Sequence, residues 1–126
     1  RFVAIDKEAD FIGKKAVILE KEDVNKTSPS LRLRTFVVDA NDADVIGDEP
    51  IWFRRGQEKS ESYEIKGWVT SGGFAHNSGV SVAMGYVPKE IANEKQGWAI
   101  DILGQRCSAT LQEEALFDPK GLIMRA

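Results

Sequence analysis

The stretch Gly67–Pro88, GWVTSGGFAHNSGVSVAMGYVP, contains two apolar runs separated by small and polar residues. The first run is Trp68–Thr70 and the second is Val80–Val87. β-branched and aromatic residues favour a pleated, half-buried strand, whereas glycine, asparagine and serine favour turns because they accept positive φ angles. The stretch therefore predicts two strands joined by an exposed connection that includes Ser71, Gly72 and Gly73.

Strand-like patterns recur on both sides of this stretch. Apolar residues alternate with other residues, or form short runs between turn signals, in segments of strand length. Between the last two segments, Gly104 and Gln105 predict a two-residue type II′ turn, because glycine stands first. Six short strands with frequent turns predict a mainly β fold that closes, or nearly closes, into an antiparallel barrel. The predicted strands span residues 31–38, 51–53, 63–70, 80–87, 98–103 and 106–111.

The first 30 residues have a different pattern. Residues 1–5 alternate as a strand does, and we interpret them as the last strand of a preceding domain. Asp10 is a predicted helix N-cap, since its carboxylate can accept a free first-turn N–H. Ile12, Ala16 and Leu19 then recur at helical spacing, which predicts a helix that ends near Asp23. The polar loop after it places the domain boundary between residues 1–28 and residues 29–126.

Composition narrows the class of protein. The chain has 126 residues, 42% of them hydrophobic, and a net charge of −3, which indicates one globular domain without a basic surface for nucleic acid. No apolar run approaches the roughly 18 residues of a membrane-spanning helix. The single cysteine, Cys107, cannot form an internal disulfide and favours a reducing, cytoplasmic location. Because the chain opens inside an apolar run without methionine, we interpret it as a piece of a longer polypeptide.

Four stretches resemble one family, both in sequence and in the order in which they occur along the chain. WVTSGG followed by VAMGYVP, together with DFIGKKAV (Asp10–Val17), DEPIWFRRG (Asp48–Gly56) and ILGQRCSAT with LFDP (Ile102–Pro119), resembles the C-terminal domain of the glycine-cleavage T-protein (aminomethyltransferase) family. The WVTSGG version and the LFDP tail are most similar to the dimethylglycine and sarcosine dehydrogenase branch. The resemblance implies a six-stranded Greek-key or jelly-roll barrel, preceded by the last helix of a folate-binding domain.

The resemblance also implies a function. The parent would be a flavoprotein that oxidises an N-methyl amine on FAD and passes the one-carbon unit to tetrahydrofolate. The barrel would close the folate cleft and contact the preceding domains of the same polypeptide. One alternative is a fragment of a free glycine-cleavage aminomethyltransferase, which takes an aminomethyl group from a lipoylated carrier. An alternative of another class is a non-catalytic, stand-alone binding barrel.

The candidate site residues lie at the start of the chain. In the family, residues just upstream of the FIG helix contribute to the folate pocket, so the resemblance makes Arg1 and Phe2 cofactor-binding candidates. The catalytic aspartate of the family and the FAD-binding glycine motif lie upstream and are absent from this sequence, so no catalytic residue is expected here. Leu122 stands where the free T-protein has a folate-contacting tyrosine, which argues against a folate role for the tail.

The histidine, the cysteine and the acidic residues lack the neighbouring side chains that catalysis or metal binding requires. His76 has no carboxylate or cysteine neighbour in the sequence, so we expect an exposed loop histidine, with an interdomain hydrogen bond as the alternative. Cys107 lacks a histidine or second cysteine, and its apolar strand predicts a buried structural thiol. The acidic residues between Asp39 and Glu49 do not fit a calcium-binding EF-hand loop and predict a solvated loop instead. No metal ligand is expected.

Three tryptophans are the largest candidate core residues. Trp52, Trp68 and Trp98 are expected to fill the barrel or its end, and Trp68 in particular to be mostly buried. The alternative is that one of them faces a neighbouring domain. Ser71, Gly72 and Gly73 follow a strand without a helix after them, so they do not predict a phosphate-binding loop.

Overall fold

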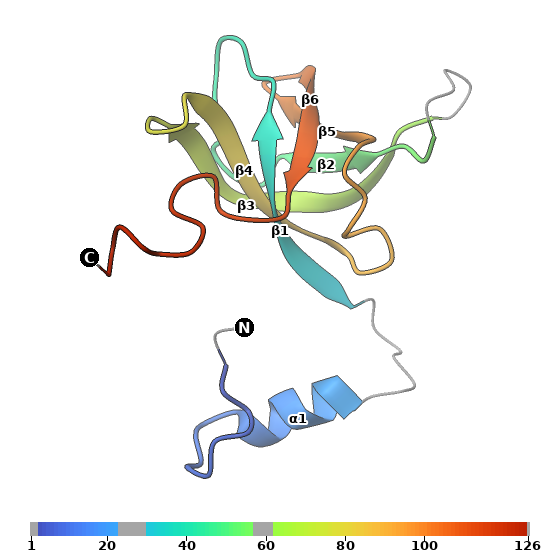
Figure 1. The fold of residues 1–126 in the computed structure, drawn as a ribbon. Helices are drawn as coiled ribbons and strands as arrows, with labels where there is room; N and C mark the ends of the chain where they lie inside the picture. Colours follow the sequence, from blue (N-terminus) through green and yellow to red (C-terminus); the bar gives the residue numbers. More distant parts are fainter. Residues whose placement is uncertain (1–2, 23–29, 57–61, 126) are drawn as a thin grey trace.

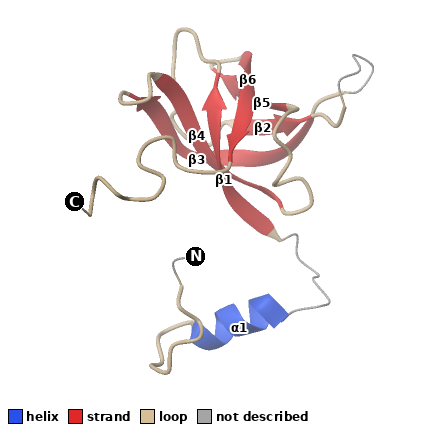
Figure 2. Cartoon of the chain, viewed as in Figure 1, coloured by secondary structure: helices blue, strands red, loops and turns tan. Residues whose placement is uncertain are grey.

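The computed structural model describes residues 3–22, 30–56 and 62–125. Within these ranges, the strands curl around one another (Figure 1), and loops join them at both ends of the strands (Figure 2). The helix is α1 (Lys14–Glu22), and the strands are β1 (Leu31–Val38), β2 (Pro50–Phe53), β3 (Glu64–Ala75), β4 (Val80–Pro88), β5 (Trp98–Ile102) and β6 (Gln105–Gln112).

The strands form a closed barrel in the order β1-β4-β3-β2-β5-β6. Each neighbouring pair is antiparallel, and β1 closes the barrel by pairing with both β4 and β6. Strands β2, β3 and β4 follow one another as neighbours, and β1 lies beside β4, which is the Greek-key arrangement. The mainly β, six-stranded antiparallel barrel predicted from the sequence is confirmed.

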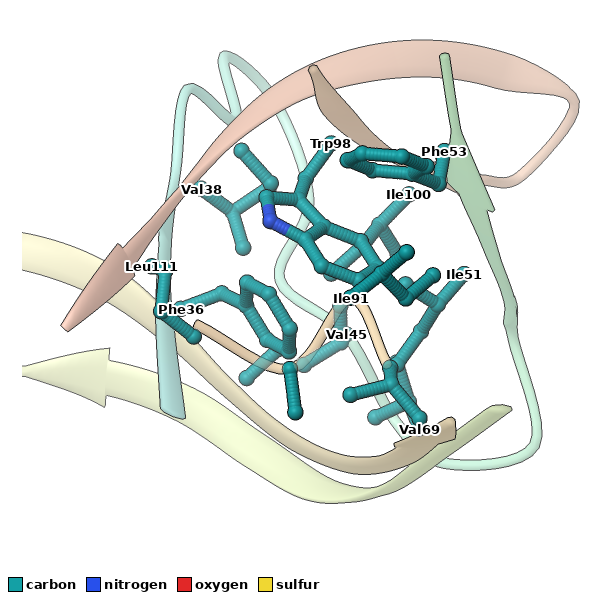
Figure 3. Packing of buried hydrophobic residues seen from close by; sticks show 14 of the residues in the cluster. Phe36, Val38, Val45, Ile51, Phe53, Val69, Ile91, Trp98, Ile100 and Leu111 are labelled. Carbon is teal, nitrogen blue, oxygen red and sulfur yellow. The ribbon is translucent and has the colours of Figure 1, made fainter. Parts of the chain in front are cut away.

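The barrel interior is filled by apolar side chains around Trp98, which is only 1% exposed. The Trp98 ring lies 5.2 Å from that of Phe36 and 4.6 Å from that of Phe53, measured between centroids (Figure 3). Its indole Nε1 donates a hydrogen bond of 2.6 Å to the carbonyl of Glu94, so the one polar atom of this side chain is satisfied. The other large residues of the core include Val38, Val45, Ile51, Val69, Val87, Ile91, Ile100 and Leu111.

Strand β3 is longer than the sequence predicts. The expected connection at Ser71, Gly72 and Gly73 is wrong, because all three pair with β4 and the strand continues to Ala75. Thr70 is the extra residue of a bulge in this pairing, and its hydroxyl donates a 3.0 Å hydrogen bond to the carbonyl of Met84. Glycine inside a strand marks such bulges and close approaches of two backbones. The true turn is the four-residue segment 76–79.

The last hairpin is confirmed, but its turn lies one residue earlier than predicted. Ile102 pairs with Gln105, so the two turn residues are Leu103 and Gly104 rather than Gly104 and Gln105. Their φ angles are 49° and 82°. Two positive φ angles in succession are typical of a type I′ turn, whose twist matches that of the flanking strands. The predicted type II′ turn is therefore wrong.

Leu103→Asn is expected to stabilise the barrel. Leucine pays a steric cost of about 1 kcal/mol in the left-handed region, and asparagine adopts this conformation more readily. The Leu103 side chain is 80% exposed, so its removal uncovers little buried surface. We expect the free energy of unfolding to rise by about 0.5–1 kcal/mol in a urea titration. An unchanged or lower value would show that the leucine side chain has a packing role.

The N-terminal segment differs from the sequence-based prediction in two details. Residues 3–5 form a turn and not the expected strand, since no described segment pairs with them. The Asp10 carboxylate accepts the adjacent Phe11 N–H, at 2.9 Å, whereas the first backbone bond of α1 runs from Val17 N–H to the Gly13 carbonyl. Asp10 is therefore not the N-cap. The helix itself is confirmed at Lys14–Glu22, and no described helix is long and apolar enough to cross a membrane.

Candidate functional site

The two residues predicted to contact the cofactor, Arg1 and Phe2, lie outside the described residues. The structure thus leaves their assignment as a prediction. The features that the structure does describe are the outer wall of the barrel, a groove beside the C-terminal tail, one half-buried thiol and an acidic loop.

Strands β1, β4 and β3 present an apolar wall to solvent. Leu33, Tyr86 and Trp68 face one another across the three strands, because Leu33 pairs with Tyr86 and Tyr86 pairs with Trp68. Directly opposed residues of an antiparallel pair point to the same face. The Trp68 and Tyr86 rings lie 5.8 Å apart between centroids. We call this wall the outer β1–β4–β3 face and define it by the outward residues Leu33, Thr35, Val37, Trp68, Ser71, Gly73, Val82, Met84 and Tyr86.

The burial predicted for Trp68 is wrong, since this side chain is 43% exposed. Its neighbour Val69 points inward and is fully buried, and two successive strand residues cannot both face the core. Trp98 fills the core as expected. Trp52 is half-buried on the outer wall, where the Arg106 guanidinium lies 3.9 Å from its ring centroid.

A groove of about 510 Å³ continues from the outer β1–β4–β3 face toward the C-terminal tail. Thr35 and Val82 of the barrel line it together with the tail residues Leu116 and Phe117. His76 lies at its rim in the turn after β3 and is exposed, in agreement with the expectation from the sequence. The lining is largely apolar, and among the described residues no carboxylate or second histidine lines the groove beside His76, so the groove offers mainly contact area.

Asp118 holds the chain beyond this groove in a turn. Its carboxylate accepts hydrogen bonds from the backbone N–H groups of Leu122, Ile123 and Met124, at 2.7, 3.1 and 3.3 Å. The side chains of these three residues remain mostly exposed. The tail therefore has a defined backbone and an uncovered apolar surface.

Cys107 is half-buried rather than fully buried. Burial raises the pKa of the Cys107 thiol, and the negative charges of Asp39 and Asp101 raise it further. A raised pKa lowers the fraction of thiolate at neutral pH, and thiolate is the nucleophilic form. The environment of Cys107 thus favours the unreactive thiol that the sequence predicts.

Two carboxylates of the acidic loop accept hydrogen bonds, one from β4 and one from the loop itself. The Asp44 carboxylate accepts a hydrogen bond of 2.5 Å from the Ser81 hydroxyl, and the Glu49 carboxylate accepts the N–H groups of Ile46 and Gly47. Asp48 has a φ of 67°, and its N–H donates to the carbonyl of Val69. In the described ranges, no three histidine, cysteine or acidic side chains gather as metal ligands do.

On β2, β5 and β6, Arg106 and Asp101 form an ion pair beside two aromatic rings. Arg106 donates two hydrogen bonds to Asp101, at 3.0 and 3.3 Å, while its guanidinium lies over Trp52 and near Tyr63. Cation–π contacts of this kind hold a guanidinium against an aromatic ring. The charge of Arg106 is therefore paired on these strands, whereas the outward positions of β1, β4 and β3 that form the apolar wall carry no charge.

Sequence reasoning missed the outer β1–β4–β3 face, although a signal for it was present. The run Val80–Val87 is almost continuously apolar, where a strand with one solvated face would alternate. Continuous apolar runs are typical of strands that are covered on both faces. The inward residues Ala83 and Val87 fill the core, and the outward Met84 and Tyr86 remain uncovered in this chain.

Comparisons with known proteins agree with this fold. The sequence-family model named glycine cleavage T-protein C-terminal barrel domain matches residues 32–118 of this chain. The chain is 30% identical over 115 residues to the mitochondrial dimethylglycine dehydrogenase of Mus musculus, and 29% identical to that of Homo sapiens. Each match covers 91% of this chain and 12% of the relative, so the chain spans about an eighth of the length of these curated proteins.

A solved structure shows the same architecture. The crystal structure of glycine cleavage system aminomethyltransferase T from Bartonella henselae matches with a TM-score of 0.60 at 21% identity, over 85% of this chain and 26% of that chain. This likeness supports the fold, and the match over residues 32–118 supports the family. The chain belongs to the glycine cleavage T-protein C-terminal barrel domain family.

Proposed function

We propose that this chain is the C-terminal barrel of a larger tetrahydrofolate-dependent one-carbon enzyme, a flavoprotein of the dimethylglycine or sarcosine dehydrogenase type. The observation that carries the proposal is the similarity to dimethylglycine dehydrogenases over 91% of this chain but only 12% of their length. The barrel closes the folate cleft and braces the preceding domains. A fragment of a free aminomethyltransferase is the second candidate, which the shared barrel fold supports.

The described residues do not fit FAD. The full sequence has no glycine-rich dinucleotide motif, and the groove beside the tail is lined mainly by apolar side chains. In the proposed parent, FAD accepts the two electrons of methylamine oxidation and tetrahydrofolate accepts the one-carbon unit, both outside these residues. The role of the barrel is therefore to help position the bound folate and to exclude water from the cleft. It supplies no reacting group.

The proposed division of the chain has residues 1–28 in the preceding folate-binding domain and residues 29–126 in the barrel. Helix α1 supports this division, because it buries none of its side chains and leaves Leu19 exposed, and Ile12 just before the helix is exposed as well. Arg1 and Phe2 remain candidates for the folate pocket. The methylamine or aminomethyl donor would reach the barrel only through the parent. A cytoplasmic location stays a prediction, and the named mammalian relatives are mitochondrial.

The test is a calorimetric titration with a stable reduced folate. We expect the 126-residue chain alone to show no binding at micromolar concentrations, because one wall of a cleft offers too little contact to offset the entropy of association. A polypeptide extended upstream through the folate-binding domains should bind, and the same polypeptide without residues 29–126 should bind at least about tenfold more weakly.

Two results would contradict the proposal. A micromolar or tighter dissociation constant for the 126-residue chain would place a complete folate site within it. Equal affinity of the extended polypeptide with and without the barrel would show that the barrel does not help to close the cleft. The sequence upstream of Arg1 separates the two candidates, because a GxGxxG start several hundred residues earlier marks the flavoprotein.

A further inference from the structure

The outer β1–β4–β3 face is a grid of three rows without charge. Leu33, Tyr86 and Trp68 form the first row across the three strands. The second row is Thr35, Met84 and Ser71, and the third is Val37, Val82 and Gly73, by the same pairings. Every outward position of these rows is uncharged, in a chain of which 29% of the residues are charged.

The first two rows expose large side chains. Leu33 is 48% exposed, Trp68 43%, Met84 40% and Tyr86 38%. The groove beside the C-terminal tail adjoins the second and third rows. Thr35 of the second row and Val82 of the third row both line this groove. Large apolar patches with a polar rim mark surfaces that contact another protein surface, and obligate interfaces are the most apolar ones.

We propose that the outer β1–β4–β3 face is the docking surface for the folate-binding part of the same polypeptide. This inference rests on the proposed function and adds to it the face through which the barrel acts. The relatives carry about seven-eighths of their length in other residues, which supply a permanent partner for an uncharged wall. The partner surface must itself be apolar, since a charge buried against this wall would have no counter-charge.

The chain favours this occupant over others. Nucleic acid requires a basic surface, and this face offers no lysine or arginine at its outward positions. The chain also leaves two large apolar side chains uncovered, Ile12 just before α1 and Leu19 within it, on the segment that the proposed division assigns to the same folate-binding domain. Two uncovered surfaces flanking one proposed boundary are expected of a domain interface. On β5 and β6, by contrast, the charge of Arg106 is paired with that of Asp101.

Hydroxyl-radical footprinting tests the inference directly. Methionine, tryptophan and tyrosine side chains oxidise readily where they are exposed. Oxidation is measured by mass spectrometry in the 126-residue chain and in the polypeptide extended upstream. We expect Trp68, Met84 and Tyr86 to oxidise at least about threefold more slowly in the extended polypeptide, with Leu103 of the β5–β6 turn unchanged as the internal control. Leu103 is 80% exposed and lies away from the three rows.

A matched pair of variants separates docking from folding. Met84→Lys places a charge in the middle of the face, and Leu103→Lys places the same charge on the control turn. In the 126-residue chain, both variants should keep the melting temperature, since both side chains are partly or mostly exposed. In the extended polypeptide, Met84→Lys should restore fast oxidation of Trp68 and Tyr86, whereas Leu103→Lys should not.

Equal oxidation of the three residues in both polypeptides would overturn the inference. So would protection that already exists in the 126-residue chain and grows with its concentration, because it would assign the face to a second copy. Folate titration of the same polypeptides keeps the two proposals apart. If the face is unprotected but removal of the barrel still weakens folate binding, the docking face is wrong and the proposed function stands. If the face is protected but removal of the barrel leaves the folate affinity unchanged, the docking face stands and the proposed role in closing the folate cleft is wrong.

Discussion

Trp98→Ala is expected to lower the free energy of unfolding by about 3–5 kcal/mol, the range for deleting a buried aromatic side chain. Trp98 is 1% exposed and packs against the rings of Phe36 and Phe53, so its removal leaves a cavity that the closed barrel cannot collapse to fill. The variant also leaves the carbonyl of Glu94 without its indole donor. A urea titration of the 126-residue chain, followed by far-ultraviolet circular dichroism, measures the loss.

Trp68→Ala is the matched control, because the same side chain is removed from a position that is 43% exposed. We expect this second loss to stay below about 1.5 kcal/mol, since less of the surface is buried and no cavity forms. If the two variants lost similar stability, Trp68 would be buried in the 126-residue chain in solution, and its outward position on β3 would be wrong. If Trp98→Ala lost less than about 1 kcal/mol, the assignment of Trp98 as the centre of the core would be wrong.

Gly85→Ala is expected to cost about 1–3 kcal/mol, the usual range for adding a methyl group to a filled site. A Cβ atom at Gly85 would meet the backbone carbonyl of Trp68 on β3 and Cδ1 of Ile51 in the core. Gly67 has the reciprocal position, since a Cβ there would meet the carbonyl of Tyr86 on β4. Strands β3 and β4 therefore approach each other where both carry glycine, and one methyl group forces the backbones apart.

A second substitution shows which contact causes the loss. Ile51→Val removes Cδ1 and costs about 0.5–1.5 kcal/mol by itself. Since the contact with the Trp68 carbonyl remains, the double variant Gly85→Ala/Ile51→Val should recover little of the loss, which a double-mutant cycle in urea measures. Full recovery would mean that the clash involves only the flexible end of Ile51. Ser71→Ala, at an exposed position of β3, serves as the control and should change stability by less than about 0.5 kcal/mol.

Local patterns were sufficient for the one helix and the six barrel strands, but not for residues 3–5, where no strand forms, or for the end of β3. The alternation in Leu31–Val38 and the turn signal near Gly104 depend on neighbours in the chain, so both could be interpreted without coordinates. The stretches around Trp68 and Val87 also identified the family, which the match over residues 32–118 confirms. One-residue errors remained at the β5–β6 turn, because alternation defines faces but not the exact pairing.

Which side of a strand faces the core was decided by closure of the barrel. Trp68 and Val69 are adjacent and both apolar, so the sequence indicates that one points inward but not which one. The pairing of β3 with β2 and β4, including the bulge at Thr70, turns Val69 inward and Trp68 outward. A one-residue change in register would reverse every side chain of the strand, and the bulge at Thr70 makes such a shift in the pairing with β4 between Val69 and Ser71.

Pairing between distant strands also decided the candidate site. The sequence by itself determined the family, the six-stranded barrel and the lack of a dinucleotide motif, because these depend on residue types and their order. Only the tertiary structure brought Leu33, Met84 and Trp68 from three strands to one uncharged face. Such a surface forms when segments far apart in the chain become neighbours in a sheet, and no local pattern records those pairings.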